Sequence, residues 1–134
     1  MIRTRVPDKE QAKSMIKAAM TEISYLKTLP PRPEAATTII RAVYENFRML
    51  GDALLRSQGS ESTGNDAHKE MIDALLQLPV KTKRPLQVLD NLRTLRHNIN
   101  YKGYQPTKDD LDDVLSMLDS CWEPLLAEVK RQVG

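Results

Sequence analysis

Apolar residues recur along most of the chain at intervals of three and four positions, with polar residues between them. This spacing places the apolar side chains on one face of an α-helix. Proline- or glycine-containing segments interrupt the pattern, and both residue types end helices. We therefore expect helices at about residues 8–29, 34–56, 66–78 and 85–103, and a fifth from about residue 107 to at least residue 129.

Local signals mark several of the expected helix ends. Pro7–Asp8 would open the first helix, and Asp66 would cap the third. Gly103 would end the fourth helix, because glycine readily adopts the left-handed conformation that closes helices. Thr107 and Asp110 have the spacing of a capping box at the start of the fifth helix.

The rest of the pattern fixes the expected fold class. No segment alternates branched and polar residues over the length of a strand, so we expect no sheet. The segment Ser57–Asn65 is rich in Gly, Ser and Thr, which predicts a mobile loop. The fold is therefore expected to be all-α: an antiparallel, up-and-down bundle of four main helices plus a short one, forming a single domain over residues 1–134.

Composition narrows the class of protein. Charged residues make up 28% of the chain and hydrophobic residues 40%, which argues against a disordered protein. Cys121 is the only cysteine, so an internal disulfide and a cysteine-rich zinc site are excluded. The first residues lack the apolar core of a signal peptide, and no apolar run approaches the roughly 20 residues that span a bilayer. These features predict a cytoplasmic protein without a membrane segment.

Charge becomes informative only locally, since the net charge of the chain is +2. One face of the helix expected at 85–103 carries basic, imidazole and amide groups within about 100° of arc, namely Arg93, Arg96, His97 and Asn100. From residue 91 to residue 108 there is no acidic side chain, so the cluster is expected to lack a carboxylate partner. A positive cluster of this kind suits a phosphate group or an RNA backbone.

Each member of the cluster also has a purely structural interpretation. Arginines near the end of a helix oppose its dipole and bind its last carbonyl groups. His97 would then be an ordinary surface residue, and Tyr101 and Tyr104 would pack across the turn. A structural helical adaptor is therefore an alternative to a binding protein.

The segment Leu92–Tyr101 resembles the signature of the HEPN family, the nucleotide-binding domains of higher eukaryotes and prokaryotes. That signature is an arginine followed a few residues later by a histidine, at the end of a late helix of the bundle. Residues 44–55 and 66–76 resemble the family's second helix and the helix after it, so the resemblance covers about residues 8–130.

The chain departs from this signature at the histidine. Counted from Arg96, the histidine position holds Tyr101; counted from Arg93, His97 arrives one residue early. In the ribonuclease members, the histidine and arginine act on the 2′-hydroxyl and the phosphate without a metal ion, and two sites meet across a dimer. Tyrosine, with an ordinary pKa of about 10, is a poor general base at neutral pH. Either His97 replaces the histidine, or Tyr101 only donates a hydrogen bond, or catalysis is lost and binding is retained.

Roles follow as hypotheses. Arg96 would hold a phosphate with its planar fork of donors, and His97 would act as acid or base because histidine titrates near neutrality. The candidate catalytic residues are Arg96, His97 and Tyr101. The candidate phosphate- or nucleotide-binding residues are Arg93, Arg96, Asn100 and Tyr104, with Glu45 and Asn98 as supporting residues.

We therefore expect a HEPN-like protein that binds RNA or a nucleotide, without a cofactor. The alternative is an active, metal-independent endoribonuclease that uses Arg96 and His97. The resemblance also implies a homodimer and a possible minimal nucleotidyltransferase as partner, as in toxin–antitoxin or defence pairs. His68 is expected to be a surface residue rather than a ligand, and the distance between the two histidines along the chain argues against a metal site.

Overall fold

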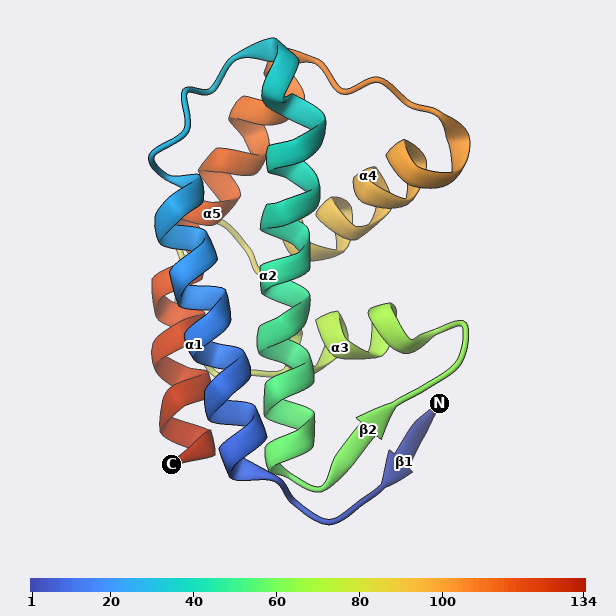
Figure 1. Ribbon diagram of the computed structural model, residues 1–134, viewed down its shortest axis with the longest axis vertical. Coiled ribbons are helices and arrows are strands. Elements are labelled where there is room, and N and C mark those ends of the chain that lie inside the picture. Colours follow the sequence, from blue (N-terminus) through green and yellow to red (C-terminus); the bar gives the residue numbers. More distant parts are fainter.

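Three long helices form the body of the protein. The structure is a computed structural model that describes residues 1–134. Figure 1 shows α1 (Lys9–Leu26), α2 (Ala36–Ser57) and α5 (Lys108–Val133) running side by side along the long axis. A short 3-10 turn, η1 (Pro33–Ala35), precedes α2. The predicted helical bundle is confirmed.

Two shorter helices complete the bundle, α3 (Ala67–Leu76) and α4 (Val88–Lys102). Both pack against α2, which contacts every other helix. In Figure 1 they lie one above the other on the same side of α2 and slant away from the long axis. Because α3 and α4 also contact each other, residues from three helices meet beside the middle of α2.

The molecule contains a small sheet, so the prediction of none was wrong. Strand β1 (Ile2–Thr4) pairs antiparallel with β2 (Ser60–Ser62), with Arg3 opposite Glu61. Each strand has only three residues and β1 is exposed throughout, so no alternating pattern marks either one in the sequence. The segment expected to be a mobile loop therefore contains a strand, and a short connection, residues 63–66, joins it to α3.

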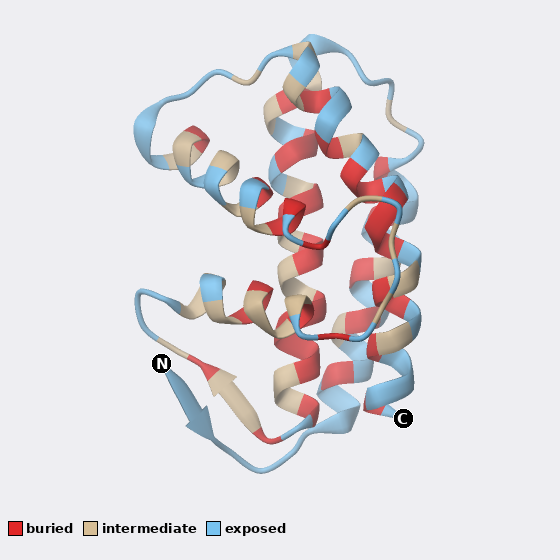
Figure 2. Ribbon diagram, turned by 180° about the vertical axis from the view of Figure 1, so that it is seen from behind, coloured by how far each residue is buried: buried red, intermediate tan, exposed pale blue.

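The core consists of the apolar faces that helical spacing predicted. Figure 2 shows the buried positions gathered on the inward faces of the helices and the exposed ones on the outer faces and connections. On α2, Val43, Phe47 and Leu50 are fully buried. The Phe47 ring meets Trp122 of α5 edge-on, with ring centroids 5.3 Å apart. No helix combines the length and the apolar content that crossing a lipid bilayer demands.

Most of the expected helix ends are confirmed. The Asp8 side chain accepts a hydrogen bond from the Gln11 N–H at 2.9 Å, and Thr107 forms the predicted capping box. Gly103 closes α4 with a φ of 66°, the left-handed conformation expected of it. Asp66 differs, because its side chain accepts no hydrogen bond from the start of α3. The first turn of α3 is thus left without a side-chain cap.

Gly51 allows α2 and α3 to pack closely. A Cβ atom at this position would collide with the Met71 carbonyl oxygen and lie 2.8 Å from its carbonyl carbon. Only glycine leaves room for the backbone of α3 at this distance. Residue 51 therefore sets how closely α3, and the side chains at its beginning, approach α2.

Candidate functional site

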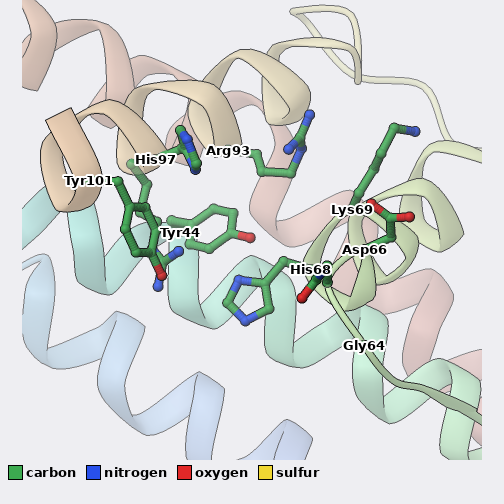
Figure 3. Close-up of a pocket in the computed structure, with 10 residues that line it drawn as sticks. Tyr44, Gly64, Asp66, His68, Lys69, Arg93, His97 and Tyr101 are labelled. Carbon is green, nitrogen blue, oxygen red and sulfur yellow. The ribbon is translucent and has the colours of Figure 1, made fainter. Parts of the chain in front are cut away.

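A cavity of about 380 Å³ opens where α2, α3 and α4 meet (Figure 3). Tyr44 of α2 lines its inner side, the loop before α3 and the first turn of α3 line one wall, and α4 lines the other. We call it the Arg96 cavity, and its lining residues are Tyr44, Gly64, Asn65, Asp66, His68, Lys69, Arg93, Arg96, His97 and Tyr101. It contains three residues of the cluster predicted on α4, Arg93, Arg96 and His97, together with the candidate residue Tyr101.

Arg96 is held between two aromatic rings. Its guanidinium carbon lies 5.4 Å from the centroid of Tyr44 and 6.0 Å from that of Tyr101. Both distances fall within the range of cation–π attraction. No carboxylate forms an ion pair with Arg96, unlike the other cations of the cavity. The rings therefore fix its position, while its five N–H donors stay available.

The other two cations of the cavity have acidic partners. Arg93 Nε donates to Asp90 at 3.0 Å, and Lys69 Nζ donates to Asp73 at 2.8 Å. The expectation that the whole cluster lacks a carboxylate was thus wrong for Arg93, because Asp90 lies one turn earlier on the same helix. Arg96 alone retains the unpaired charge that the sequence predicted for the cluster.

Two histidines from different helices line the cavity. The His68 ring lies 5.9 Å from the Tyr44 ring, and the His97 ring lies 4.9 Å from that of Tyr101. Burial lowers the pKa of His68, and the positive charges of Arg48 and Arg96 lower it further against the opposing effect of Glu45. His68 in the free protein is therefore a neutral acceptor near pH 7. An anion in the cavity would favour the protonated form of His68 and so raise its pKa.

The lowered pKa of His68 predicts a loss of stability at mildly acidic pH. The unfolded chain holds a proton on this residue below about pH 6.5, whereas the folded protein binds that proton only at lower pH. Stability should therefore fall as pH drops through 6.5 and level off below the folded-state pKa. Melting temperatures between pH 8 and 5 should show a smaller fall for His68→Gln than for the parent. Parallel curves for the two proteins would contradict the assignment.

Glu45 does not line the cavity but pairs with Arg48 of the same helix. Burial acts to raise the pKa of Glu45, but its hydrogen bond with Arg48 and that residue's charge outweigh burial, so the pKa is lowered. Arg48 Nε donates to Glu45 at 3.0 Å, and its Nη1 lies 3.2 Å from the Met71 sulfur on α3. The pair links α2 to α3 next to His68. The packing of the second helix beside the fourth, on which a role for Glu45 depended, is confirmed.

The remaining predicted site residues lie outside the cavity. Asn100 Oδ1 accepts a hydrogen bond from Arg41 Nε at 2.6 Å, in a neighbouring hollow that Arg96 also borders. The Tyr104 hydroxyl donates to Asp110 at 2.6 Å, which raises the pKa of Tyr104. The Asn98 carbonyl accepts the Tyr104 N–H at 3.1 Å and helps to close α4. These three residues hold the end of α4 in place.

Sequence reasoning missed Tyr44 and His68. Tyr44 lies within the apolar stripe of α2, where an aromatic residue resembles any other core residue, and it is fully buried. His68 was expected to face solvent, but it is half-buried because α3 packs closely on α2. The available signals were a phenol, which carries a polar hydroxyl, within the apolar stripe of α2 and an imidazole in the first turn of a helix.

Comparison with known proteins adds no assignment. No family model, curated protein or solved structure matches the chain. The protein also brings together no group of three side chains that could hold a metal ion.

Proposed function

We propose that the protein binds the phosphate groups of a nucleotide or an RNA strand in the Arg96 cavity. The observation that carries the proposal is the state of Arg96, a cation fixed between two rings with no carboxylate partner. A guanidinium forms paired, charge-assisted hydrogen bonds with phosphate oxygens. Because Arg96 is already positioned, an incoming phosphate would order few additional side chains.

The rim of the cavity favours a nucleic-acid ligand over a simple anion. The Tyr101 ring is 69% exposed although it lines the cavity, and the His97 ring lies beside it. Exposed aromatic rings next to a cationic site provide a surface on which bases stack. A phosphate at Arg96 would leave its base within reach of Tyr101.

The proposal includes the context that the sequence resemblance implies. In that context the protein is a HEPN-like domain of the cytoplasm, it forms a homodimer, and its possible partner is a minimal nucleotidyltransferase. The Arg96 cavity opens at the surface, so a ligand, a second subunit or a partner protein can approach it.

Ribonuclease activity is the second candidate, and the presence of two histidines beside Arg96 favours it. One neutral imidazole would take the proton of a 2′-hydroxyl, whose oxygen would attack the adjacent phosphorus. A protonated imidazole would give its proton to the leaving 5′-oxygen. The products would be a 2′,3′-cyclic phosphate and a 5′-hydroxyl, and Arg96 would neutralise the charge of the phosphorus centre.

One RNA-binding experiment tests the proposal. A short single-stranded RNA with a fluorescent label is titrated with protein in EDTA, and anisotropy reports the affinity. Arg96→Ala should weaken binding about tenfold or more, since a hydrogen-bonded charge pair with phosphate is lost. It should also reduce the dependence of binding on salt, because fewer counterions are released.

Arg32→Ala is the matched control, since Arg32 is an exposed arginine on the connection between α1 and α2. Its affinity should equal that of the parent, and circular dichroism should show the same helix content in all three proteins. An equal loss of RNA affinity in Arg96→Ala and Arg32→Ala would mean that only the total charge of the protein matters, and it would contradict a site at Arg96. Gel analysis of the same samples tests the second candidate: cleavage that requires Arg96, His68 and His97 would establish the ribonuclease.

A further inference from the structure

Helix α3 begins at the Arg96 cavity with unused backbone donors. The N–H groups of His68 and Lys69 donate to no acceptor within the protein. Asp66, which stands where a side chain usually satisfies such groups, accepts no hydrogen bond from them. The positive end of the helix dipole has the same location, so the start of α3 favours an anion.

The Tyr44 hydroxyl is a second, independent sign of a missing partner. Tyr44 is 0% exposed, and its hydroxyl forms no hydrogen bond. Figure 3 shows this hydroxyl directed into the cavity, toward the space between Arg93 and His68. A buried hydroxyl without a partner is destabilising, and such groups are rare in folded proteins. A ligand atom that accepts its hydrogen would satisfy it.

These donors face the cations of α4. Figure 3 shows Arg93 on α4, across from the first turn of α3, with the Tyr44 hydroxyl between these two walls. Arg96 lines the cavity from the same helix, α4. The only carboxylate of the lining, Asp66, is exposed to solvent. The inner part of the cavity therefore offers backbone, phenol and guanidinium donors to one ligand group.

We propose that the inner part of the cavity binds a terminal phosphate, the phosphomonoester at the end of an RNA strand or of a mononucleotide. Tyr44, the amides of His68 and Lys69, and Arg96 would hold it together. This inference rests on the proposed function, and it names the class of ligand that the same cavity takes.

The number of donors favours a monoester over an internal phosphate. A terminal phosphate carries a charge of about −1.5 to −2 near neutral pH and has three free acceptor oxygens. An internal phosphodiester has a single charge and two such oxygens. The buried Tyr44 closes the inner side of the cavity, so an internal phosphate at this depth would have to bring both flanking nucleotides into the cavity with it. A terminal phosphate brings only one.

The test compares ends of the same RNA at pH 7.5. One oligonucleotide is prepared with a 5′-phosphate, with a 3′-phosphate and with hydroxyls at both ends, each labelled away from the tested end. The parent should bind one of the phosphorylated forms about tenfold more tightly than the hydroxyl form. A nucleoside monophosphate and its nucleoside are compared in parallel, which distinguishes a free nucleotide from a strand end as the source of the phosphate.

Tyr44→Phe isolates the hydroxyl while it keeps the ring. The variant should lose about tenfold of the preference for the phosphorylated end, as expected for a hydrogen bond to a charged group. Its melting temperature without ligand should be equal to or higher than that of the parent, because an unsatisfied hydroxyl is removed. Tyr25→Phe, at an exposed tyrosine of α1, is the matched control and should change neither quantity.

Amide spectra provide a readout at α3 itself. In ¹H–¹⁵N spectra, the His68 and Lys69 N–H signals should move downfield with the monophosphate and stay in place with the nucleoside. Unchanged amide signals, equal affinity for phosphorylated and hydroxyl ends, or an unchanged preference in Tyr44→Phe would each overturn the inference while the proposed function stands. Failure of the parent to bind any RNA or nucleotide would overturn both.

Discussion

Gly51→Ala is expected to destabilise the protein by about 3 kcal/mol and to abolish RNA binding. The added methyl group would meet the Met71 carbonyl group, which belongs to the backbone of α3 and cannot rotate away. Alanine favours the helical conformation over glycine by about 1 kcal/mol, which offsets only part of the strain. Relief requires α3 to move away from α2, and His68 and Lys69 would move with it.

Thermal unfolding and the RNA titration test this expectation together. The melting temperature should fall by roughly 10 °C, from the size of the free-energy change and of the domain. Ser116→Ala, at an exposed position of α5, is the control for a change to helix-favouring alanine where no collision occurs. A variant at position 51 with parental melting temperature and affinity would mean that α3 does not need this close approach.

Trp122→Ala is expected to cost about 3–5 kcal/mol of unfolding free energy, the range for truncating a large buried aromatic residue. Trp122 is 2% exposed and packs edge-on against Phe47, so its removal leaves a cavity between α5 and α2. Urea denaturation followed by circular dichroism measures the change, because Trp122 is the only tryptophan and its fluorescence disappears with it.

The control for Trp122→Ala is a truncation at an aromatic residue that has little buried surface. Tyr25 of α1 is 61% exposed, and Tyr25→Ala should change the unfolding free energy by less than about 1 kcal/mol. Similar losses for the two variants would contradict a core centred on the contact between α2 and α5. A Phe47→Ala variant, alone and combined with Trp122→Ala, would then measure the coupling between the rings.

The helices could be predicted because their signals are local. The apolar stripe of α2, the Thr107 capping box and the glycine at 103 each act within a few residues of chain. The pairing of β1 with β2 joins residues about sixty positions apart, as in Arg3 opposite Glu61. Three exposed residues in a strand leave no apolar alternation to detect, so only the folded chain reveals the pair.

The candidate site likewise has one part that the sequence could predict, the residues on α4, and one part that it could not, the residues on other helices. Arg93, Arg96, His97 and Tyr101 share one helix, so helical geometry alone brought them together. The wall opposite them comes from α3, and its distance from α4 depends on packing against α2. Asn100 satisfied the same arithmetic, yet its amide is taken by Arg41 of α2. Residues within one helix can be grouped from spacing, whereas contacts between helices require the packing.

The short strand pair has a consequence for the energetics of recognition. The residues of β1 bury almost nothing, and burial alone would rank them as dispensable. Yet their backbone bonds to β2, together with the bond from the Arg5 N–H to the Gly59 carbonyl at 2.7 Å, restrain the segment that delivers the start of α3. Without that restraint, part of the binding free energy of the ligand would be needed to offset the loss of conformational entropy when the segment becomes ordered. The pairing of β1 with β2 thus preorganises the cavity, because it holds the start of α3 in place before a ligand binds.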